Sequence, residues 1–355
     1  MRALDFLVQT RLSPSASLAQ DAHFLQEVTA PSAPRRPLLR VYELAGEGVA
    51  LGRYHLAPVA AKPGVGPWLY RRHSGGRAAP FGEGFVGVTL VLPHRSALLS
   101  NDPFALAPHQ VLNRYVRGIL HACRRLGLEA FYPGRDAVTS GGRVLGLMSF
   151  EVDRSGAMLF ETILAVGRDF SILPSLLETV DRSGVVKAEV PEAQRMTCIE
   201  RQLGRRVDLA ELVEALRQGY EQHFKLSLDA HTLTPAEQTA IDAIAADRFA
   251  ADLGLHERRL PTGSWRYAGI RGQLGMFEAY VDLGPGCLRA VRFAGDFIAN
   301  SVAVDQLECD LRSCAPDWDA IDTVVSRVYS RPENYVLGIG KLHTIADTIM
   351  KALGT

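Results

Sequence analysis

The chain has 355 residues, in which 39 lysines and arginines balance 39 aspartates and glutamates. This length predicts one large domain and a smaller one, and the neutral balance excludes a global field that would draw the protein to nucleic acid or to an anionic membrane. The longest apolar runs are well short of the roughly 20 residues that span a bilayer, and the N-terminus lacks the basic-then-apolar pattern of a signal peptide, so we expect a soluble, cytoplasmic protein.

The N-terminal part of the chain predicts one helix and three strands, followed by a second helix. Residues 16–29 begin with serines that can cap a helix, and their apolar residues recur at helical spacing. Strands are expected at 38–42, at 49–54 and at 85–92. Residues 108–126 place apolar side chains on one face and are expected to form an amphipathic helix.

The middle of the chain predicts a hairpin and two further helices. Strand patterns near 143–150 and 158–166 flank a short turn, which is typical of a hairpin. Helices are expected over 208–224 and 234–251. The second begins with Thr234 as the N-cap, a proline at the first helical position and a glutamate three residues after the cap.

The last hundred residues predict a second hairpin and two helices. The strands of the hairpin are expected at 277–282 and 288–293, around a Gly-Pro-Gly turn. The helices are expected near 302–313 and 317–329.

A domain boundary is expected near residue 255, in a polar and broken segment over 254–264 that permits movement between two domains. The predicted fold is α+β. Residues 1–255 are expected to form a large domain with a mixed or mainly antiparallel sheet flanked by helices, and residues 256–355 a small α+β accessory domain.

The five cysteines form an odd set that contains no C-x-x-C pair: Cys123, Cys198, Cys287, Cys309 and Cys314. This pattern argues against a disulfide framework and against a zinc site. We expect these residues to be reduced and to serve as small core side chains.

Residues 71–78 (RRHSGGRA) are the most informative stretch for function. Paired glycines let backbone N–H groups approach an anion closely, and neighbouring guanidiniums add fixed positive charge. The loop therefore predicts a cradle for a phosphate or an acyl phosphate, directly ahead of the apolar run at 85–92.

Three further segments combine glycine, charge and strand ends. Residues 133–136 (PGRD) precede residues 141–146 (GGRVLG), and residues 295–297 (GDF) end the hairpin of the small domain. Each segment alone is a weak signal, because glycine serves turns with positive φ in many proteins. Their order along the chain carries more information.

In that order the chain resembles the lipoate-protein ligase family, a branch of the biotin and lipoate ligases, over nearly its whole length. The matching motifs are SLAQDAHFL, LGRYH, RRHSGGRA with the strand after it, GRDAV followed by GGRVLG, and FETIL. VRFAGDFIA followed by LECDLRS is similar to the accessory domain of that family. The resemblance implies the biotin/lipoate ligase fold.

The resemblance also implies a two-step reaction. ATP, with Mg²⁺, converts lipoate or octanoate into an acyl adenylate, and a lysine of a lipoyl carrier domain then accepts the acyl group. The carrier would belong to a 2-oxoacid dehydrogenase or to a glycine cleavage H-like protein. Such chemistry needs N–H donors and cations around the phosphate, an apolar tunnel for the acyl chain and protection of the anhydride from water.

By the same resemblance, the residues that would bind the acyl adenylate lie in the glycine-rich segments. Arg72, Ser74, Gly75 and Gly76 would line the acyl or phosphate site, and Arg135 and Asp136 would lie near the nucleotide or metal. Arg53 would support the mouth of the tunnel. The neighbouring Arg77, Ala78 and Gly146 complete the expected set. No residue is assigned as a metal ligand.

The chain departs from the family at the catalytic position. Arg143 stands where the family has a lysine, and no lysine occurs between Lys62 and Lys187. A guanidinium is larger and flatter than an ammonium, so we expect slower adenylation or transfer, although it can bind a carboxylate or phosphate through two hydrogen bonds. Two histidines usual in the family are replaced within Ala79–Phe81 and Phe160–Thr162.

Two other functions stay open. The chain could be a ligase-fold pseudoenzyme that binds the lipoyl or acyl-adenylate group without turning it over, or an ATP-independent octanoyl or lipoyl transferase with a cysteine nucleophile. The second function needs a cysteine near the acyl site, and none lies between Cys123 and Cys198. Among the histidines, only His73 is of interest for function, because it lies beside the glycine pair.

Overall fold

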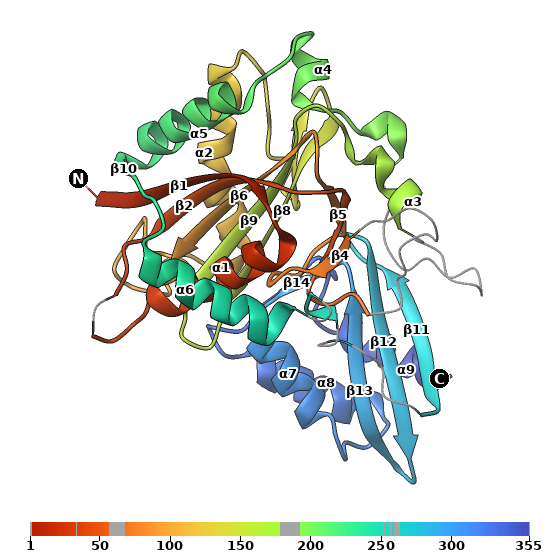
Figure 1. Cartoon of the computed structure of the whole chain (residues 1–355). Helices are drawn as coiled ribbons and strands as arrows, with labels where there is room; N and C mark the ends of the chain where they lie inside the picture. Colours follow the sequence, from red (N-terminus) through yellow and green to blue (C-terminus); the bar gives the residue numbers. More distant parts are fainter. Residues whose placement is uncertain are drawn as a thin grey trace.

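A mixed sheet of seven strands forms the centre of the N-terminal part of the protein (Figure 1). The computed structural model describes residues 2–32, 34–56, 68–177, 192–250, 253–255, 258 and 263–354. The strand order is β10-β1-β2-β6-β9-β8-β7; β1 pairs in parallel with both of its neighbours and the other pairs are antiparallel. The strands are β1 (Arg2–Leu12), β2 (Leu38–Leu44), β6 (Phe85–Leu92), β7 (Ala137–Ser140), β8 (Arg143–Val152), β9 (Met158–Ala165) and β10 (Leu226–Ala230).

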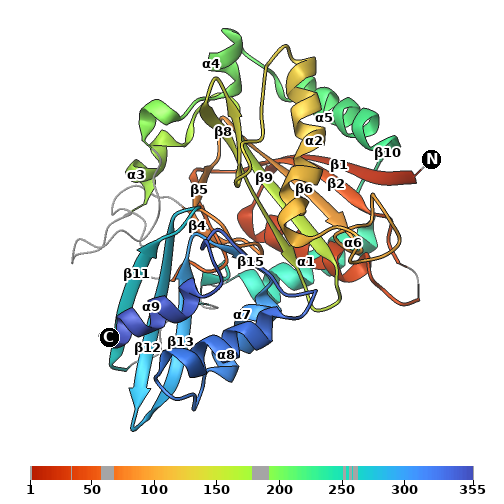
Figure 2. The same cartoon turned by 180° about the vertical axis from the view of Figure 1, so that it is seen from behind.

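Helices cover both faces of this sheet, as Figures 1 and 2 show from opposite sides. One face carries α1 (Pro14–Glu27), on which α6 (Pro235–Ile244) packs, and the other face carries α2 (Val111–Arg125) and α5 (Leu209–Phe224). The Ser13 hydroxyl caps α1, and Thr234 and Glu237 form a reciprocal capping box on α6. We call the two faces the α1 face and the α2 face.

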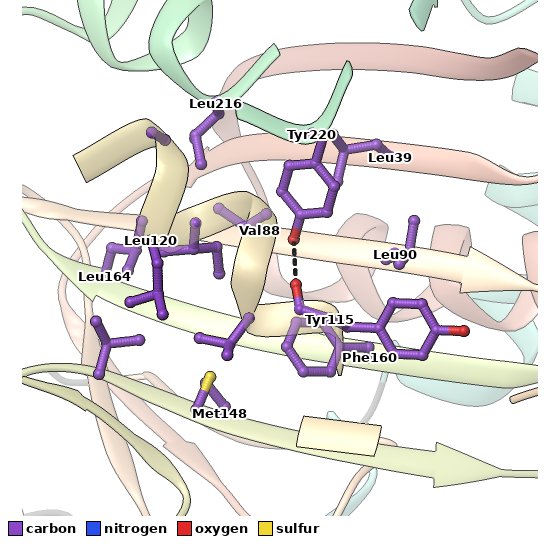
Figure 3. Packing of buried hydrophobic residues seen from close by; sticks show 14 of the residues in the cluster. Leu39, Val88, Leu90, Tyr115, Leu120, Met148, Phe160, Leu164, Leu216 and Tyr220 are labelled. Atoms are coloured by element: carbon purple, nitrogen blue, oxygen red, sulfur yellow. Dashed lines mark hydrogen bonds between the residues drawn. The ribbon is translucent and has the colours of Figure 1, made fainter. Parts of the chain in front are cut away.

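The α2 face is packed with apolar side chains. Figure 3 shows Leu39, Val88 and Phe160 on the strands meeting side chains of α2 and α5. The hydroxyl of Tyr220 on α5 donates a hydrogen bond to the carbonyl of Tyr115 on α2 at 3.4 Å. Burial of these side chains away from water is the main favourable term that joins the two helices to the sheet.

A small sheet and several short elements complete the N-terminal part. The small sheet has the order β4-β3-β5 and consists of β3 (Gly48–Leu51), β4 (Trp68–Arg71) and β5 (Ala79–Phe81). The short helices are α3 (Leu173–Leu176), α4 (Ile199–Leu203), 3₁₀ turns at Pro108–Gln110, Phe170–Ile172 and Ala193–Arg195, and a π-helical turn at Ala245–Phe249 that continues α6.

The C-terminal part has its own core. An antiparallel sheet of β11 (Trp265–Arg271), β12 (Met276–Gly284) and β13 (Cys287–Gly295) packs against α7 (Ser301–Asp310), α8 (Trp318–Tyr329) and α9 (Thr344–Leu353), and β14 (Ile298–Ala299) pairs with β15 (Val336–Leu337). Phe277, Phe293 and Ile321 belong to its apolar cluster. We call this part the accessory domain.

The predicted α+β fold class is confirmed, and the predicted elements fall within a few residues of those observed. The α-helix predicted over 234–251 is shorter, because its last turn widens to a π-helical turn. The strand predicted over 49–54 ends at Leu51, since Arg53 and Tyr54 lie in a turn. The sequence patterns missed β1, β4, β5, β7, β10, β11 and α9, together with the shortest elements α3, α4, β14 and β15.

The boundary expected near residue 255 stays a prediction. Residues 256, 257 and 259–262 of the expected linker lie outside the described residues. No helix in the described ranges is long and apolar enough to cross a membrane. All five cysteines carry free thiols. Cys123 and Cys198 are buried as expected of core residues, whereas Cys287 and Cys314 are half-buried and Cys309 is exposed.

Candidate functional site

The glycine-rich loop, residues 71–78, lies over the α1 face of the large sheet. It joins β4 to β5, and two of its contacts reach α1 and the large sheet. His73 Nε2 lies 2.9 Å from the carbonyl oxygen of Leu18 on α1, and the backbone N–H of Ser74 donates to Glu161 Oε2 on β9 at 3.1 Å. Ser74 is fully buried. The loop is therefore positioned by a helix and a strand that are far from it in sequence.

Arg71 organises the neighbouring turn at residues 52–55. Its guanidinium is buried and donates to the carbonyl oxygens of Gly52 at 3.3 Å, Arg53 at 3.0 Å and Gly254 at 3.2 Å, and also to that of His55. Backbone carbonyls thus surround this side chain, which holds the turn in place. The expected role of Arg53 at a tunnel mouth stays a prediction.

Arg72 and Arg77 also bind protein groups. Arg72 is buried and donates to the carbonyl oxygens of Gly75 and Arg77 at 2.8 and 2.9 Å, which closes the loop on itself. Arg77 binds both carboxylate oxygens of buried Asp136 at 2.8 Å. Such bidentate pairs are the stronger class of charge-assisted hydrogen bonds. The pair joins the loop to the start of β7, so two of the predicted segments do meet.

The accessory domain covers the glycine pair. The N–H of Gly76 donates to the carbonyl oxygen of Phe297 at 2.7 Å, and a side-chain carbon on Gly75 would lie 2.3 Å from the same oxygen. The ring of Tyr54 stacks on Phe297 at 4.3 Å, and its hydroxyl donates to Ala299 at 2.9 Å. The Gly76 N–H, expected to hold an anion, binds the accessory domain in this structure.

Two buried ionisable groups of the N-terminal part also meet the accessory domain. His55 Nε2 lies 2.9 Å from Asp296 Oδ1, and both side chains are almost fully buried. Glu151 Oε1 accepts hydrogen bonds from the backbone N–H and the hydroxyl of Ser301, at the start of α7, at 2.8 and 2.7 Å. Burial raises the pKa of Glu151 to about 7, although the nearby Arg53 lowers it. Sequence reasoning missed these contacts.

A row of buried polar residues crosses four strands beneath the loop. Arg40 on β2 pairs across the sheet with Thr89 on β6, Thr89 with Glu161 on β9, and Glu161 with Ser149 on β8. The exposed fraction of each side chain is 7% or less. Asp21 on α1 accepts a hydrogen bond from Arg40 above this row. We call these five residues the polar row.

The sequence contains a signal for the polar row. Arg40 and Glu161 place a charged side chain, and Ser149 a hydroxyl, within strands that are mostly apolar and almost entirely buried. A charged residue in a strand that is otherwise buried on both faces is a candidate for a site. Sequence reasoning used FETIL and GGRVLG as family motifs but did not single out Arg40, Ser149 or Glu161 as site residues.

The space beside the polar row is narrow. A cavity of about 10 Å³ is lined by Tyr42, Leu44, Tyr70, Phe81, Phe85, Gly87 and Ile163. This volume corresponds to about one water molecule. An acyl chain could enter only if the aromatic side chains moved. A wider cleft of about 320 Å³, lined in part by Glu43, Glu200 and Arg206, shares only Phe85 with this wall and lies away from the loop.

Arg143 lies at the edge of the site region. It is the first residue of β8, pairs with Ser140, and has an exposed side chain. Gly146 on the same strand is buried, and a side-chain carbon there would lie 3.0 Å from Leu164. Arg135 is exposed, and Ala78 is buried in a small apolar cluster. The roles of these residues stay predictions.

Neither a metal centre nor a reactive thiol stands out around the loop. In the described part of the chain, no group of three or more His, Cys, Asp or Glu side chains could hold a metal ion, and Arg77 occupies both oxygens of Asp136. Burial raises the pKa of Cys123 to about 12, which keeps this thiol protonated. Cys198 is buried in the apolar core at the start of the five-residue helix α4.

Comparisons with known proteins agree with this architecture. A family model described as the lipoyl protein ligase A/B catalytic domain matches residues 13–221. P. falciparum LipL1 in complex with lipoate has 12% sequence identity and a TM-score of 0.69, with 98% of this chain and 99% of that chain covered. No match was found among curated proteins.

Two shorter structures match the larger part of the chain. A bipartite lipoate protein ligase from Thermoplasma acidophilum, described together with its E2 lipoyl domain, has 18% identity and a TM-score of 0.59 over 74% of this chain and 99% of that chain. A lipoate-protein ligase A bound with ATP has 18% identity and a TM-score of 0.57 over 71% of this chain and 99% of that chain. At these identities the likeness shows the shared fold.

Proposed function

Because the chain belongs to the lipoyl protein ligase A/B catalytic domain family, we propose that it activates lipoate or octanoate with ATP to an acyl adenylate and transfers the acyl group to a lysine of a lipoyl carrier domain. The observation that carries the proposal is the position of the glycine-rich loop, which lies between the polar row and the accessory domain. The ATP-bound, lipoate-bound and lipoyl-domain relatives support the choice of substrates and acceptor.

In the first step a carboxylate oxygen of the acid attacks the α-phosphorus of ATP and pyrophosphate leaves. In the second step the lysine amine attacks the acyl carbonyl carbon, loses a proton and expels AMP. The proposed carrier is the lipoyl domain of a 2-oxoacid dehydrogenase or a glycine cleavage H-like protein, and we place the reaction in the cytoplasm. Mg²⁺ would enter with the phosphates of ATP.

The loop would supply the electrostatic part of the first step. The N–H of Gly76 becomes available to a phosphate oxygen when the carbonyl of Phe297 moves away, and Ser74, Gly75 and Ala78 would line the same wall. Arg72 already holds the loop in shape through two carbonyl oxygens, so its part is to position the donors. Arg143 would bind the carboxylate or phosphate in place of the lysine.

A second function has specific support. Arg143 replaces the ammonium group expected at the reacting centre, and the Gly76 N–H is bound by the accessory domain. A chain with these properties would bind an acyl adenylate and present or sequester it without forming it. This chain would then be a binding module with a ligase fold.

One experiment separates the two functions. AMP release and the intact mass of a lipoyl-domain acceptor are measured for the wild type, for Arg143→Lys and for the exposed control Arg154→Lys. We expect the wild type to release AMP and to modify the acceptor, and Arg143→Lys to be faster by about one order of magnitude, while Arg154→Lys matches the wild type.

The other outcomes are equally informative. Binding of lipoyl-AMP by a wild type that neither forms nor transfers it would contradict the ligase and support the binding module. Acylation of the acceptor from an acyl carrier protein without ATP, through a thioester on a cysteine of this chain, would support the transferase instead.

A further inference from the structure

The polar row contains hydrogen-bonding groups that the described residues leave unsatisfied. Arg40 has no exposed surface, and its Nε and Nη2 atoms have no hydrogen-bond partner among the described residues. The hydroxyl of Ser149 in the row, the hydroxyl of Ser74 in the loop and the side-chain oxygen of Gln20 on α1 also lack a partner among the described residues. Buried polar groups are almost always paired, so this concentration indicates that another molecule completes the set.

Arg40 lies beside the narrow cavity. Its guanidinium stacks on the ring of Tyr42 at 4.8 Å, and Tyr42 lines the cavity together with Gly87, its partner across the sheet. The hydroxyl of Tyr42 lies 3.4 Å from that of Thr89 in the polar row. The cavity and the polar row therefore lie side by side on the α1 face of the sheet.

The distance from the loop to Arg40 suits an acyl chain. The loop touches the row at Glu161, which accepts the N–H of Ser74, and Arg40 lies two strands away. Two strand spacings amount to about 10 Å. This is close to the length of an extended eight-carbon acid. A chain that starts at the loop would place its far end beside Arg40 and Tyr42.

We propose that this end of the site selects a medium-chain acid whose far end carries a hydrogen-bond acceptor, such as an ω-hydroxyl or a second carboxylate. Arg40 donates to that acceptor through Nε and Nη2, while its Nη1 donates to Asp21, which holds the guanidinium in place. A plain alkyl end would leave both donors buried and unpaired. The inference rests on the proposed acyl-adenylate chemistry and narrows its substrate class, because octanoate, which has a plain alkyl end, is expected to bind more weakly than an acid with an acceptor at its far end.

The charges between the loop and Arg40 favour this class. Arg40 and Arg72 balance Asp21 and Glu161, and all four contribute to the electrostatic environment of Tyr70 or Tyr42. Burial raises the pKa of Asp21, and Arg40 opposes this shift. A neutral acceptor fits such a balanced site directly, and a second carboxylate fits when Asp21 takes up a proton.

The test measures binding to the full chain by calorimetry for octanoate, 8-hydroxyoctanoate, octanedioate and, as a reference, lipoate, without ATP. We expect the wild type to bind 8-hydroxyoctanoate at least about ten-fold more tightly than octanoate, because a site built to bind a hydroxyl discriminates against the analogue that lacks it. Arg40→Leu should abolish this preference. The control Arg36→Leu, which removes an arginine with 46% side-chain exposure, should keep it.

If Arg40→Leu does not fold, the double variant Arg40→Leu/Asp21→Leu is tested instead. The preference of the wild type for 8-hydroxyoctanoate over octanoate decides the inference in either case. Octanoate bound as tightly as 8-hydroxyoctanoate by the wild type would overturn the inference and leave the ligase proposal intact. Failure of all three acids and of lipoate to bind would overturn both.

Discussion

The two faces of the large sheet are buried to a similar degree but carry different chemistry. On the α2 face, an apolar row crosses the same four strands as the polar row, using the residue next to each polar one: Leu39, Leu90, Phe160 and Phe150. None of these four side chains has exposed surface. On the α1 face the matching positions carry Arg40, Thr89, Glu161 and Ser149. An apolar row stabilises the fold, whereas a charged row is destabilising unless a partner or ligand completes it.

The largest expected loss of stability comes from a substitution in the apolar row. Phe160→Ala should lower the free energy of unfolding by about 4 kcal/mol, because it removes a fully buried ring and leaves a cavity under α2. Urea denaturation followed by circular dichroism measures this change. The control Phe104→Ala, at a side chain with 49% exposure, should stay within about 0.5 kcal/mol. Similar losses for both variants would contradict the core assignment.

The polar row should respond differently to single and double substitutions. Arg40→Leu alone should lower stability by about 3 kcal/mol, because Asp21 would remain as a buried, unpaired carboxylate. Arg40→Leu/Asp21→Leu should recover most of that loss, since a buried ion pair contributes little net stability. Denaturation of the two variants under identical conditions checks this. Additive losses would show that the row is a stabilising element, like the apolar row.

A third prediction concerns the pH dependence of stability at Glu151, which lies on β8 two residues after Ser149 and contacts Ser301 of the accessory domain. Its folded pKa of about 7 is above the usual value of 4.5, so between these values the folded state binds more protons than the unfolded state. Stability from this group is therefore present at low pH and is lost as pH rises toward 7.

Between pH 5.5 and 7.5 this contribution should fall by about 2 kcal/mol. The measurement is the difference in pH dependence between the wild type and Glu151→Gln, which removes the titration and keeps a hydrogen-bond acceptor for Ser301. The difference cancels the opposing contributions of histidines whose pKa is lowered, such as His223. Parallel pH profiles would show that Glu151 does not titrate in this range.

The smallest effect is expected at the glycine-rich loop. Gly75→Ala should lower stability by about 1 kcal/mol, because the new methyl group would push the carbonyl of Phe297 away. Hydrogen exchange at residues 296–299 should rise, since the contact of the accessory domain with the loop is loosened.

The control for this variant is Gly134→Ala, at a glycine with φ of +88° and open space around its Cα. It should lower stability through backbone strain alone and leave exchange at 296–299 unchanged. Equal exchange in both variants would mean that the loop does not hold the accessory domain.

The sequence predicted the fold well where local signals were strong. The capping box at Thr234 located the start of α6, and the alternating or continuous apolar runs located β6, β8 and β9 within a few residues. β1 was missed, although it lies inside the sheet, because its side chains mix charged, polar and apolar types without a clear period. Tertiary pairing with β2 and β10 decides its conformation.

For the candidate site, the amino-acid sequence by itself determined the family, through the order of its glycine-rich segments, and predicted that Arg143 stands at the position of a lysine. Only the tertiary structure decided what those segments touch. The loop bonds to Phe297 of the accessory domain, Arg77 is paired with Asp136, and the polar row assembles from strands far apart in sequence. The reason is physical: a buried charge or a glycine N–H has no preferred partner in the sequence, and its partner is chosen when the chain packs.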